Sequence, residues 1–152
     1  MSLYAIVRLR GSAQKPTAIN YALQCLGLTR VNSCVVLEYN DYNKGQLKKV
    51  KDYVTFGEIN DDTLKSMVEK RGRLEGDKRI TDSFLKEKKL SIDTLLKMYK
   101  QDVNKVYALG IKKVFRLSPA SKGLKSVKLS FAQGGDLSYR GDKINDLLNK
   151  MI

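Results

Sequence analysis

The sequence predicts an α+β fold in which a small sheet and several helices share one domain. Three short apolar runs with strand-like spacing lie in the first 60 residues, and segments with helical periodicity separate them. A length of 152 residues suits one domain, or a small domain with a long appendage. We therefore expect a compact α/β core over 1–60 and a mainly helical extension over 61–152 that packs on it.

The core is expected to run strand, helix, strand, helix, strand. Residues 4–10 form an apolar run that ends in alternating arginines, which indicates a strand whose end meets an acidic partner. Pro16 and Thr17 open a helix, and Gly27 suits its C-terminal end because glycine adopts the left-handed conformation at low cost. Residues 34–38 form the second strand.

The second half of the core begins with a polar loop over 40–45. A short lysine-bearing helix follows, with Leu47 and Val50 facing inward, and residues 53–59 change to the period of two that is typical of a strand. An antiparallel or mixed three-stranded sheet, backed by helices on one face, fits this order.

The extension is expected to be built mainly from helices. The first helix begins after Asn60 and ends at Gly72, and another begins at 81–82. Ser91 is the predicted N-cap of the longest helix, which ends at Gly110.

The last third of the chain combines a short strand at 114–117, a stretch rich in Gly, Ser and Lys at 118–137, and a closing C-terminal helix. Residues 111–152 hold nine Lys or Arg against three Asp or Glu, while core-forming residues are sparse. Such a basic tail tends to become ordered only against a partner.

The charge of the whole chain predicts a polyanionic partner. Lys and Arg number 29 against 16 Asp and Glu, a formal net charge of +13. No apolar run approaches the roughly 18 residues of a membrane span, and the N-terminus does not resemble a signal peptide. Cys25 and Cys34 lie on apolar faces and suit reduced core positions in a cytoplasmic protein. Nucleic acid is therefore favoured over membrane.

Nothing in the composition asks for catalysis. Histidine, the commonest general base and a common metal ligand, is absent. With only two cysteines, a zinc site would need carboxylate ligands, which structural zinc sites rarely use. The glycine-rich phosphate loops and nucleophile motifs of common enzyme classes are also absent. We expect no catalytic residue, no metal site and no cofactor.

Four basic clusters are the candidate nucleic-acid contacts, because Arg and Lys suit phosphate oxygens. The clusters are Arg8, Arg10, Gly11 and Lys15 with Arg30 and Asn32; Lys44, Lys48, Lys49 and Lys51; Lys70, Arg71, Arg73, Lys78 and Arg79; and the tail residues Lys112, Lys113, Arg116, Lys122, Lys125, Lys128 and Arg140.

The first three clusters also have a second interpretation without a ligand. The first could be a solvated sheet edge and the second a solvated helix surface. The third contains Glu69, Glu75 and Asp77, so local ion pairing could account for it.

Base-specific recognition is not indicated. No RRM, KH, zinc-finger or helix-turn-helix motif is present, so recognition by phosphate and shape is favoured. Tyr39, Tyr42 and Tyr139 lie in expected loops and are the candidates for stacking on unpaired bases.

Ordered strings along the chain carry a family resemblance. The core holds YAIVRLRG at 4–11, LGLTRVNSC at 26–34 and YNKGQLKKVKDYVTFGEI at 42–59; the extension holds LKSMVEKRG at 64–72, KRITDSFL at 78–85, FRLSP at 115–119 and GGDLSYRGDKINDLL at 134–148. Together they resemble the large-subunit ribosomal protein family numbered thirty in bacteria and seven in eukaryotes, in its longer archaeal form.

The resemblance implies a ferredoxin-like α+β core with an antiparallel sheet. It implies a structural role on large-subunit ribosomal RNA in the cytoplasm, near the 5S-type RNA and adjoining ribosomal proteins. It puts the first cluster, Lys44 and Gly45 on the family's RNA-facing surface. Arg140 falls on the closing motif with Gly134, Gly135 and Asn145, and the chain departs from the family pattern at Ala120-Ser121 and at Ser138, where a glycine is common.

Two other functions compete with a ribosomal role. One is a small phosphate hydrolase of the acylphosphatase type, in which Arg10 or Arg30 binds phosphate and Asn32 orients water; the glycine-rich cradle for such a site is missing. The other is a general RNA- or DNA-compacting protein, which would show little preference between duplex DNA and folded RNA.

Overall fold

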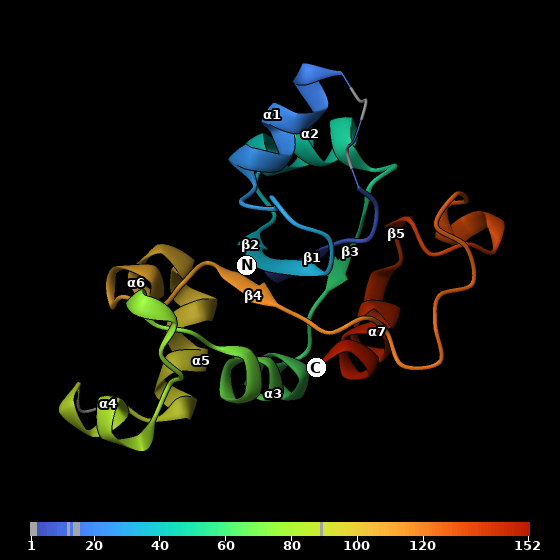
Figure 1. Ribbon diagram of the computed structural model, residues 1–152. Helices are drawn as coiled ribbons and strands as arrows, with labels where there is room; N and C mark the ends of the chain where they lie inside the picture. The colour runs from blue at the N-terminus through green and yellow to red at the C-terminus, as the bar shows by residue number, and fades with distance from the viewer. Residues whose placement is uncertain (1–2, 12, 14–15, 89) are drawn as a thin grey trace.

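The computed structural model describes residues 3–11, 13, 16–88 and 90–152, and the predicted contact Lys15 lies outside them (Figure 1). The strands are β1 Leu3–Arg8, β2 Ser33–Glu38, β3 Val54–Glu58, β4 Val114–Arg116 and β5 Ser138–Tyr139. The helices are α1 Thr17–Cys25, α2 Asp41–Val50, α3 Asp61–Arg71, α4 Asp82–Glu87, α5 Ile92–Gln101, α6 Val103–Ala108 and α7 Ile144–Met151; the 3-10 turns are η1 Glu75–Asp77, η2 Phe131–Gln133 and η3 Gly141–Lys143.

The five strands form one sheet in the order β4-β2-β1-β3-β5. The strand-helix-strand-helix-strand core is confirmed, with β1 antiparallel to both β2 and β3. The expectation of an antiparallel sheet is wrong for the whole molecule, because β5 pairs parallel with β3. The chain reaches the free edge of β3 running in the same direction as that strand, so the complete sheet is mixed.

Helices cover both faces of the sheet, and alternation along β1 shows how. Ile6 packs with the apolar residues of α1 and α2, while Ala5 and Val7 pack with residues of α3, α5, α6 and α7. Figure 1 shows these two helix groups on opposite sides of the strands. The prediction that helices cover one face of the sheet is therefore correct only for α1 and α2 of the core, since the helices of the extension cover the other face. β1 is the middle strand of the sheet, and its side chains pack in both apolar clusters. Burying each large aliphatic side chain contributes about 1.5–3 kcal/mol, so this strand contributes strongly to stability.

The predicted loop over 40–45 is wrong, because α2 begins at Asp41. Asn40 is extended and forms the N-cap, and its carbonyl oxygen accepts from the Lys44 N–H at 2.9 Å. The Asp41 carboxylate lies in the first turn, where the helix dipole favours negative charge. Lys44 and Gly45 are therefore helical residues.

The predicted long helix after Ser91 is also wrong, because it is broken at Asp102. Ser91 is the N-cap as expected, and its Oγ accepts from the Thr94 N–H at 3.2 Å. Asp102 is extended, with φ of −163°, and its Oδ1 accepts from the Asn104 N–H at 2.9 Å. A residue that offers a cap competes with helix continuation, so α5 ends and α6 begins there.

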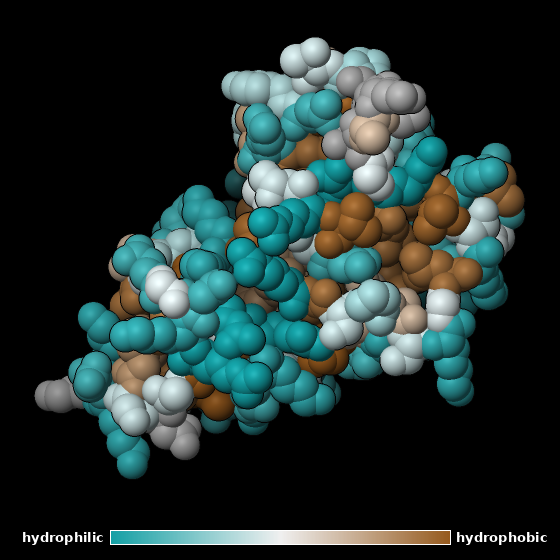
Figure 2. Space-filling view, viewed as in Figure 1, coloured by the Kyte–Doolittle hydropathy of each residue, from teal (hydrophilic) through white to brown (hydrophobic). Residues whose placement is uncertain are grey.

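The sheet's flank at β4 is strongly hydrophilic. Figure 2 shows hydrophilic side chains gathered over β4 and the neighbouring helices of the extension. In the described part of the chain, no helix is long and apolar enough to cross a bilayer.

Candidate nucleic-acid interface

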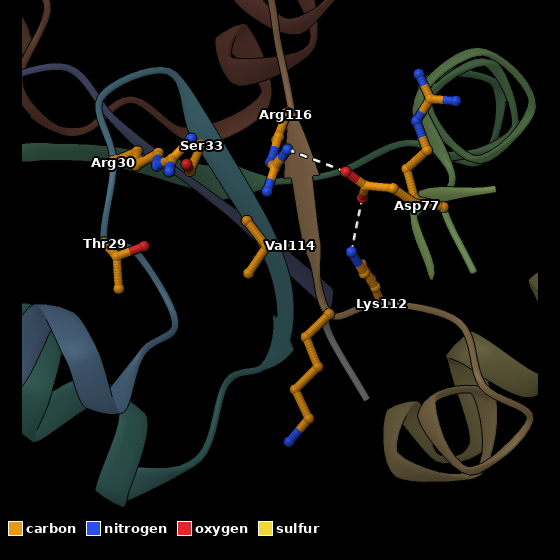
Figure 3. A pocket seen from close by; sticks show the side chains of 9 residues that line it. Thr29, Arg30, Ser33, Asp77, Lys112, Val114 and Arg116 are labelled. Carbon is orange, nitrogen blue, oxygen red and sulfur yellow. Dashed lines mark hydrogen bonds and ion pairs between the residues drawn. The ribbon is translucent and has the colours of Figure 1, made fainter. Parts of the chain in front are cut away.

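A basic groove of about 360 Å³ lies beside the β2–β4 edge of the sheet (Figure 3). It is lined by Thr29, Arg30, Ser33, Arg73, Asp77, Lys112, Lys113, Val114 and Arg116. Five of these residues are cationic and one is acidic. We name this set the β4 groove.

Backbone pairing brings three distant segments together in the β4 groove. The antiparallel register of β2 and β4 sets Ser33 opposite Arg116. The segment that follows α3 joins them, because the Lys112 N–H donates to the Arg73 carbonyl at 2.8 Å. Arg30 lies three residues before β2, and its side chain lines the groove at the same edge (Figure 3). The groove is therefore a product of tertiary pairing.

One carboxylate organises part of the groove. Asp77 accepts from Lys112 Nζ at 2.6 Å and pairs with Arg116 Nη1 at 3.3 Å (Figure 3). The hydrogen bond and charge of Lys112, with the charge of Arg116, hold the Asp77 pKa below its usual range. Lys112 and Arg116 are distant from Asp77 in sequence. The alternative in which Asp77 pairs with neighbouring basic residues of its own loop is therefore wrong.

The remaining arginines of the groove keep their donors available. Neither Arg30 nor Arg73 makes a side-chain hydrogen bond to the described residues. Guanidinium groups offer planar forks that match phosphate oxygens. Cations gathered this densely repel one another unless an anion neutralises them, so the groove is suited to a phosphate backbone.

Arg8 plays an internal role at the end of β1. Its residue is only 4% exposed, and Nη1 donates to the carbonyls of Leu28 at 2.8 Å and Thr29 at 2.9 Å. Burial lowers the pKa of its guanidinium. A side chain committed to these carbonyls is not a surface contact; it holds the segment that presents Arg30.

The rest of the first cluster lies around that segment. Arg10 is half-buried, with its guanidinium 5.5 Å from the Tyr53 ring centroid, and Gly11 is exposed. Asn32 has a φ of +62°, a left-handed conformation that asparagine tolerates. Its N–H donates to the Arg8 carbonyl at 2.8 Å, so it shapes the turn into β2.

The lysine cluster of α2 is a separate surface. Lys44, Lys48 and Lys49 are exposed, as is Gly45. Lys48 and Lys49 stand in the last turn, where positive charge is favourable to the helix dipole. None of these residues lines the β4 groove.

The third cluster divides between two roles. Lys70, Lys78 and Arg79 are exposed, and Arg73 lines the β4 groove. Arg71 instead donates to the Ile152 carbonyl at 2.9 Å from Nη2 and at 3.1 Å from Nε, and it also bonds the Ser118 hydroxyl. Arg71 therefore fastens the end of the chain to α3.

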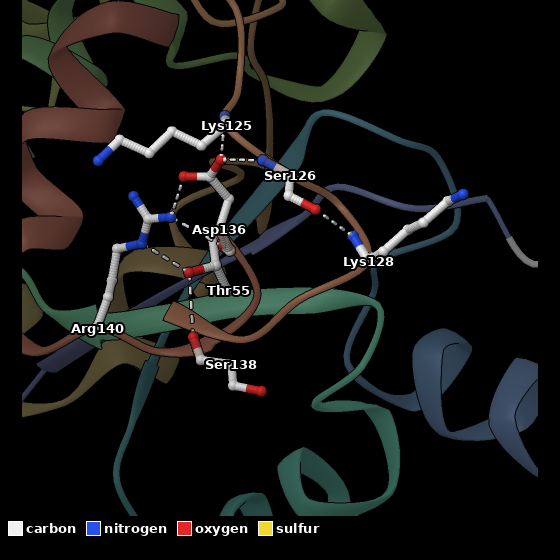
Figure 4. Close-up of polar contacts among 7 residues, drawn as sticks. All are labelled: Thr55, Lys125, Ser126, Lys128, Asp136, Ser138 and Arg140. Carbon is white, nitrogen blue, oxygen red and sulfur yellow. Dashed lines mark hydrogen bonds and ion pairs between the residues drawn. The ribbon is translucent and has the colours of Figure 1, made fainter. Parts of the chain in front are cut away.

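Arg140, predicted as a tail contact, is buried in an internal network (Figure 4). Its Nη2 donates to Asp136 Oδ1 at 2.8 Å and its Nε donates to Thr55 Oγ1 at 2.9 Å. Asp136 also accepts from the backbone N–H groups of Lys125 and Ser126. Arg140 thus ties β3 to the 118–137 segment, while the side chains of Lys122 and Lys125 stay exposed.

The sequence did not predict that basic residues of the tail and of the core line the same groove. Lys112, Lys113 and Arg116 belonged to the tail cluster, but nothing in the periodicity joined them to Arg30 and Arg73. The signal that could have found them is the strand at 114–117, whose pairing partner the local pattern does not identify.

Comparison with known proteins identifies the family. The family model for ribosomal protein L30p/L7e matches residues 4–54. Two archaeal relatives, both named large ribosomal subunit protein uL30, match nearly the whole chain or all of it. The protein of Methanococcus vannielii is 47% identical, covering 98% of this chain and 99% of its own length. That of Nanoarchaeum equitans is 40% identical and covers all of both chains.

These relatives settle the question of class. The family consists of structural ribosomal proteins, so the prediction that the chain is not an enzyme is confirmed and the phosphate hydrolase alternative falls away. The match extends from the core through the extension, as the ordered strings predicted. The chain belongs to the L30p/L7e family of ribosomal proteins, in its archaeal form.

Proposed function

We propose that the chain is a structural component of the large ribosomal subunit in the cytoplasm, where it binds and stabilises folded ribosomal RNA. The observation that carries the proposal is the β4 groove, whose lining includes five cationic side chains and one carboxylate. The names of the relatives, all large ribosomal subunit protein uL30, support the same assignment. The partners would be large-subunit RNA, including the 5S-type RNA, and neighbouring ribosomal proteins.

Binding through phosphates and shape agrees with the form of the groove. The Arg and Lys residues that line the β4 groove come from irregular segments and a short strand, rather than from a helix of the kind that enters a DNA major groove. Phosphate contacts position a protein on folded RNA without a base code.

We divide the proposed contacts into direct contacts and positioning residues. The direct contacts are Arg10, Gly11, Lys15, Arg30, Asn32, Lys44, Gly45, Lys48, Lys49, Lys70, Arg73, Lys78, Arg79, Lys122 and Lys125, together with Lys112, Lys113 and Arg116. Arg8, Arg71 and Arg140 are proposed as positioning residues, because their guanidinium groups bond protein carbonyls or an internal carboxylate.

The test is the salt dependence of binding to purified archaeal large-subunit RNA. About six to ten phosphate contacts lower the affinity by roughly three to five decades between 50 and 200 mM salt on a duplex. The double variant Arg30→Gln/Arg73→Gln should reduce the slope of log K against log salt by about two, one for each lost contact. Filter binding at a series of KCl concentrations measures this slope.

The matched control is Lys97→Gln with Lys86→Gln, which removes two exposed cations outside the groove. An equal loss of slope in both double variants would show that total charge, rather than the groove, governs binding. Competition with duplex DNA at fixed salt addresses the RNA- or DNA-compacting alternative, since a ribosomal role requires a clear preference for the folded RNA.

A further inference from the structure

A second hollow, of about 200 Å³, lies between α2 and the β3–β5 edge, and the β4 groove does not include it. It is lined by Tyr39, Lys44, Leu47, Lys48, Lys51, Phe56, Ser138 and Tyr139. Its aromatic and aliphatic side chains form an apolar surface, while three lysines and no acidic residue complete the lining. We name it the tyrosine hollow.

The aromatic rings of the tyrosine hollow are held in defined orientations. Tyr39 stacks on Tyr4 with ring centroids 4.4 Å apart and planes 19° apart. Tyr139 lies 5.7 Å from Phe56 and 6.4 Å from Tyr4. Tyr39 is nevertheless 41% exposed and Tyr139 is 51% exposed, so parts of these ordered rings face solvent.

The Glu58 carboxylate orients the rings of Tyr4 and Tyr139 through hydrogen bonds. The hydroxyl of Tyr139 donates to both of its carboxylate oxygens, at 2.8 and 3.0 Å, and the hydroxyl of Tyr4 donates to Oε1 at 2.7 Å. Burial raises the pKa of Glu58, but the hydrogen bonds from the two phenol groups outweigh this effect, so the pKa lies below its usual range. The carboxylate stays charged at neutral pH and continues to orient both rings.

The lysines supply the charge that an exposed aromatic site would need for nucleic acid. Lys44 and Lys48 are one turn apart on α2, and Lys51 follows three residues later. Like charges at this spacing repel, so an anion among them would be stabilising. Lys44 Nζ also lies 5.9 Å from the Tyr39 ring centroid.

We propose that the tyrosine hollow binds one unpaired RNA base, with the α2 lysines holding the phosphates that flank it. Stacking on an aromatic face beside a positively charged groove is the general mode by which proteins hold single-stranded nucleic acid. The inference rests on the proposed RNA-binding function and deepens it: the β4 groove takes phosphates, whereas this hollow takes a base that duplex RNA does not present.

The experiment compares two probes with the full chain at low salt. One is fluorescein-labelled single-stranded hexa-adenylate RNA, and the other is the same hexamer with abasic riboses, which keeps the phosphates. Fluorescence anisotropy should show tighter binding of hexa-adenylate. Replacing Tyr139 with leucine should weaken hexa-adenylate binding by about 5- to 150-fold and leave the abasic hexamer unchanged, because base–aromatic stacking is lost.

Tyr21→Leu is the matched control, since Tyr21 lies on α1 with 65% exposure and does not line the hollow. Its affinity for hexa-adenylate should equal that of the unmodified chain. Lys48→Gln should weaken both probes by the same factor. Tyr39→Leu gives a second ring deletion, and the comparison of the two probes on the unmodified chain needs no substitution.

Equal affinity of the unmodified chain for hexa-adenylate and the abasic hexamer would overturn the proposal. So would displacement of hexa-adenylate by an acidic phenylalanine-containing peptide that binds more tightly, which would mark the hollow as a protein-docking surface. Neither result touches the ribosomal RNA function, which the Arg30→Gln/Arg73→Gln slope tests separately.

Discussion

Three arginines that the sequence predicted as RNA contacts instead make hydrogen bonds within the protein. Arg8 donates to backbone carbonyls beside β2, Arg71 donates to the carbonyl of the last residue, and Arg140 pairs with Asp136. A guanidinium can satisfy several acceptors at once, so in a basic protein it suits both phosphate binding and internal bridging. Which role applies depends on whether carbonyl or carboxylate oxygens lie within reach.

The Asp136–Arg140 pair predicts a pH-dependent stability. Burial raises the pKa of Asp136, but hydrogen bonds from Arg140, Ser126 and Lys125 outweigh this effect. The pKa in the folded state therefore lies below its usual value. The carboxylate therefore favours folding above about pH 3.9, and this contribution is lost as the pH falls through the lower folded value. Asp136→Asn should cost about 3–5 kcal/mol at pH 7, since it leaves Arg140 buried without its partner.

Urea unfolding between pH 7 and pH 2 measures this effect. The stability of Asp136→Asn should fall less steeply than that of the unmodified chain as the solution becomes acidic. Asp52→Asn, at an exposed turn residue, is the control and should keep the unmodified profile. Parallel profiles for Asp136→Asn and the unmodified chain would refute the assignment.

At the scale of elements, β3 depends on a close approach to the turn before α7. A Cβ on Gly57 would lie 2.1 Å from the backbone oxygen of Gly141, which is too close for any side chain. The neighbouring contact is a hydrogen bond from Asn145 Nδ2 to the Glu58 carbonyl at 3.0 Å. The absence of a side chain at residue 57 therefore lets the C-terminal helix dock on the sheet.

Gly57→Ala should accordingly destabilise the protein by about 1–3 kcal/mol, the typical cost of overpacking. Gly45→Ala makes the same chemical change in α2, where nothing lies within 4 Å of the added Cβ. It should stabilise the protein by about 0.5–1 kcal/mol, because alanine loses less conformational freedom in a helix. Chemical denaturation of both variants would decide: a stable Gly57→Ala protein would contradict the packing of β3 on this turn.

At the scale of the whole molecule, the net charge of +13 makes the free protein self-repelling. Added salt shortens the Debye length from about 10 Å at 0.1 M to about 3 Å at 1 M and screens that repulsion. The Tm of the RNA-free protein should therefore rise with KCl, by roughly 2–4 °C for each kcal/mol of repulsion relieved. Calorimetry at increasing KCl measures the rise.

An anion that fills the β4 groove should add to general screening. At matched ionic strength, sulfate should raise the Tm more in the unmodified chain than in Arg30→Gln/Arg73→Gln, while any general sulfate effect acts on both. A Tm that decreases with KCl would show that ion pairs, rather than repulsion, dominate the surface.

The sequence by itself determined the strand-helix-strand-helix-strand core and the family. Local periodicity reports which face of an element is apolar, and the ordered strings span the chain from Tyr4 to Leu148. Composition determined the sign of the partner's charge. These properties depend on neighbouring residues, or on sums over the chain, so no tertiary contact is needed to read them.

Only the tertiary structure decided which basic residues share a surface. Periodicity does not identify the partner of β4, so it does not place Arg30 beside Arg116, and it does not orient β5 parallel to β3. The burial of Arg140 depends on Thr55, 85 residues earlier in the chain. Pairing and burial arise from contacts between segments far apart in sequence, which a local pattern does not contain.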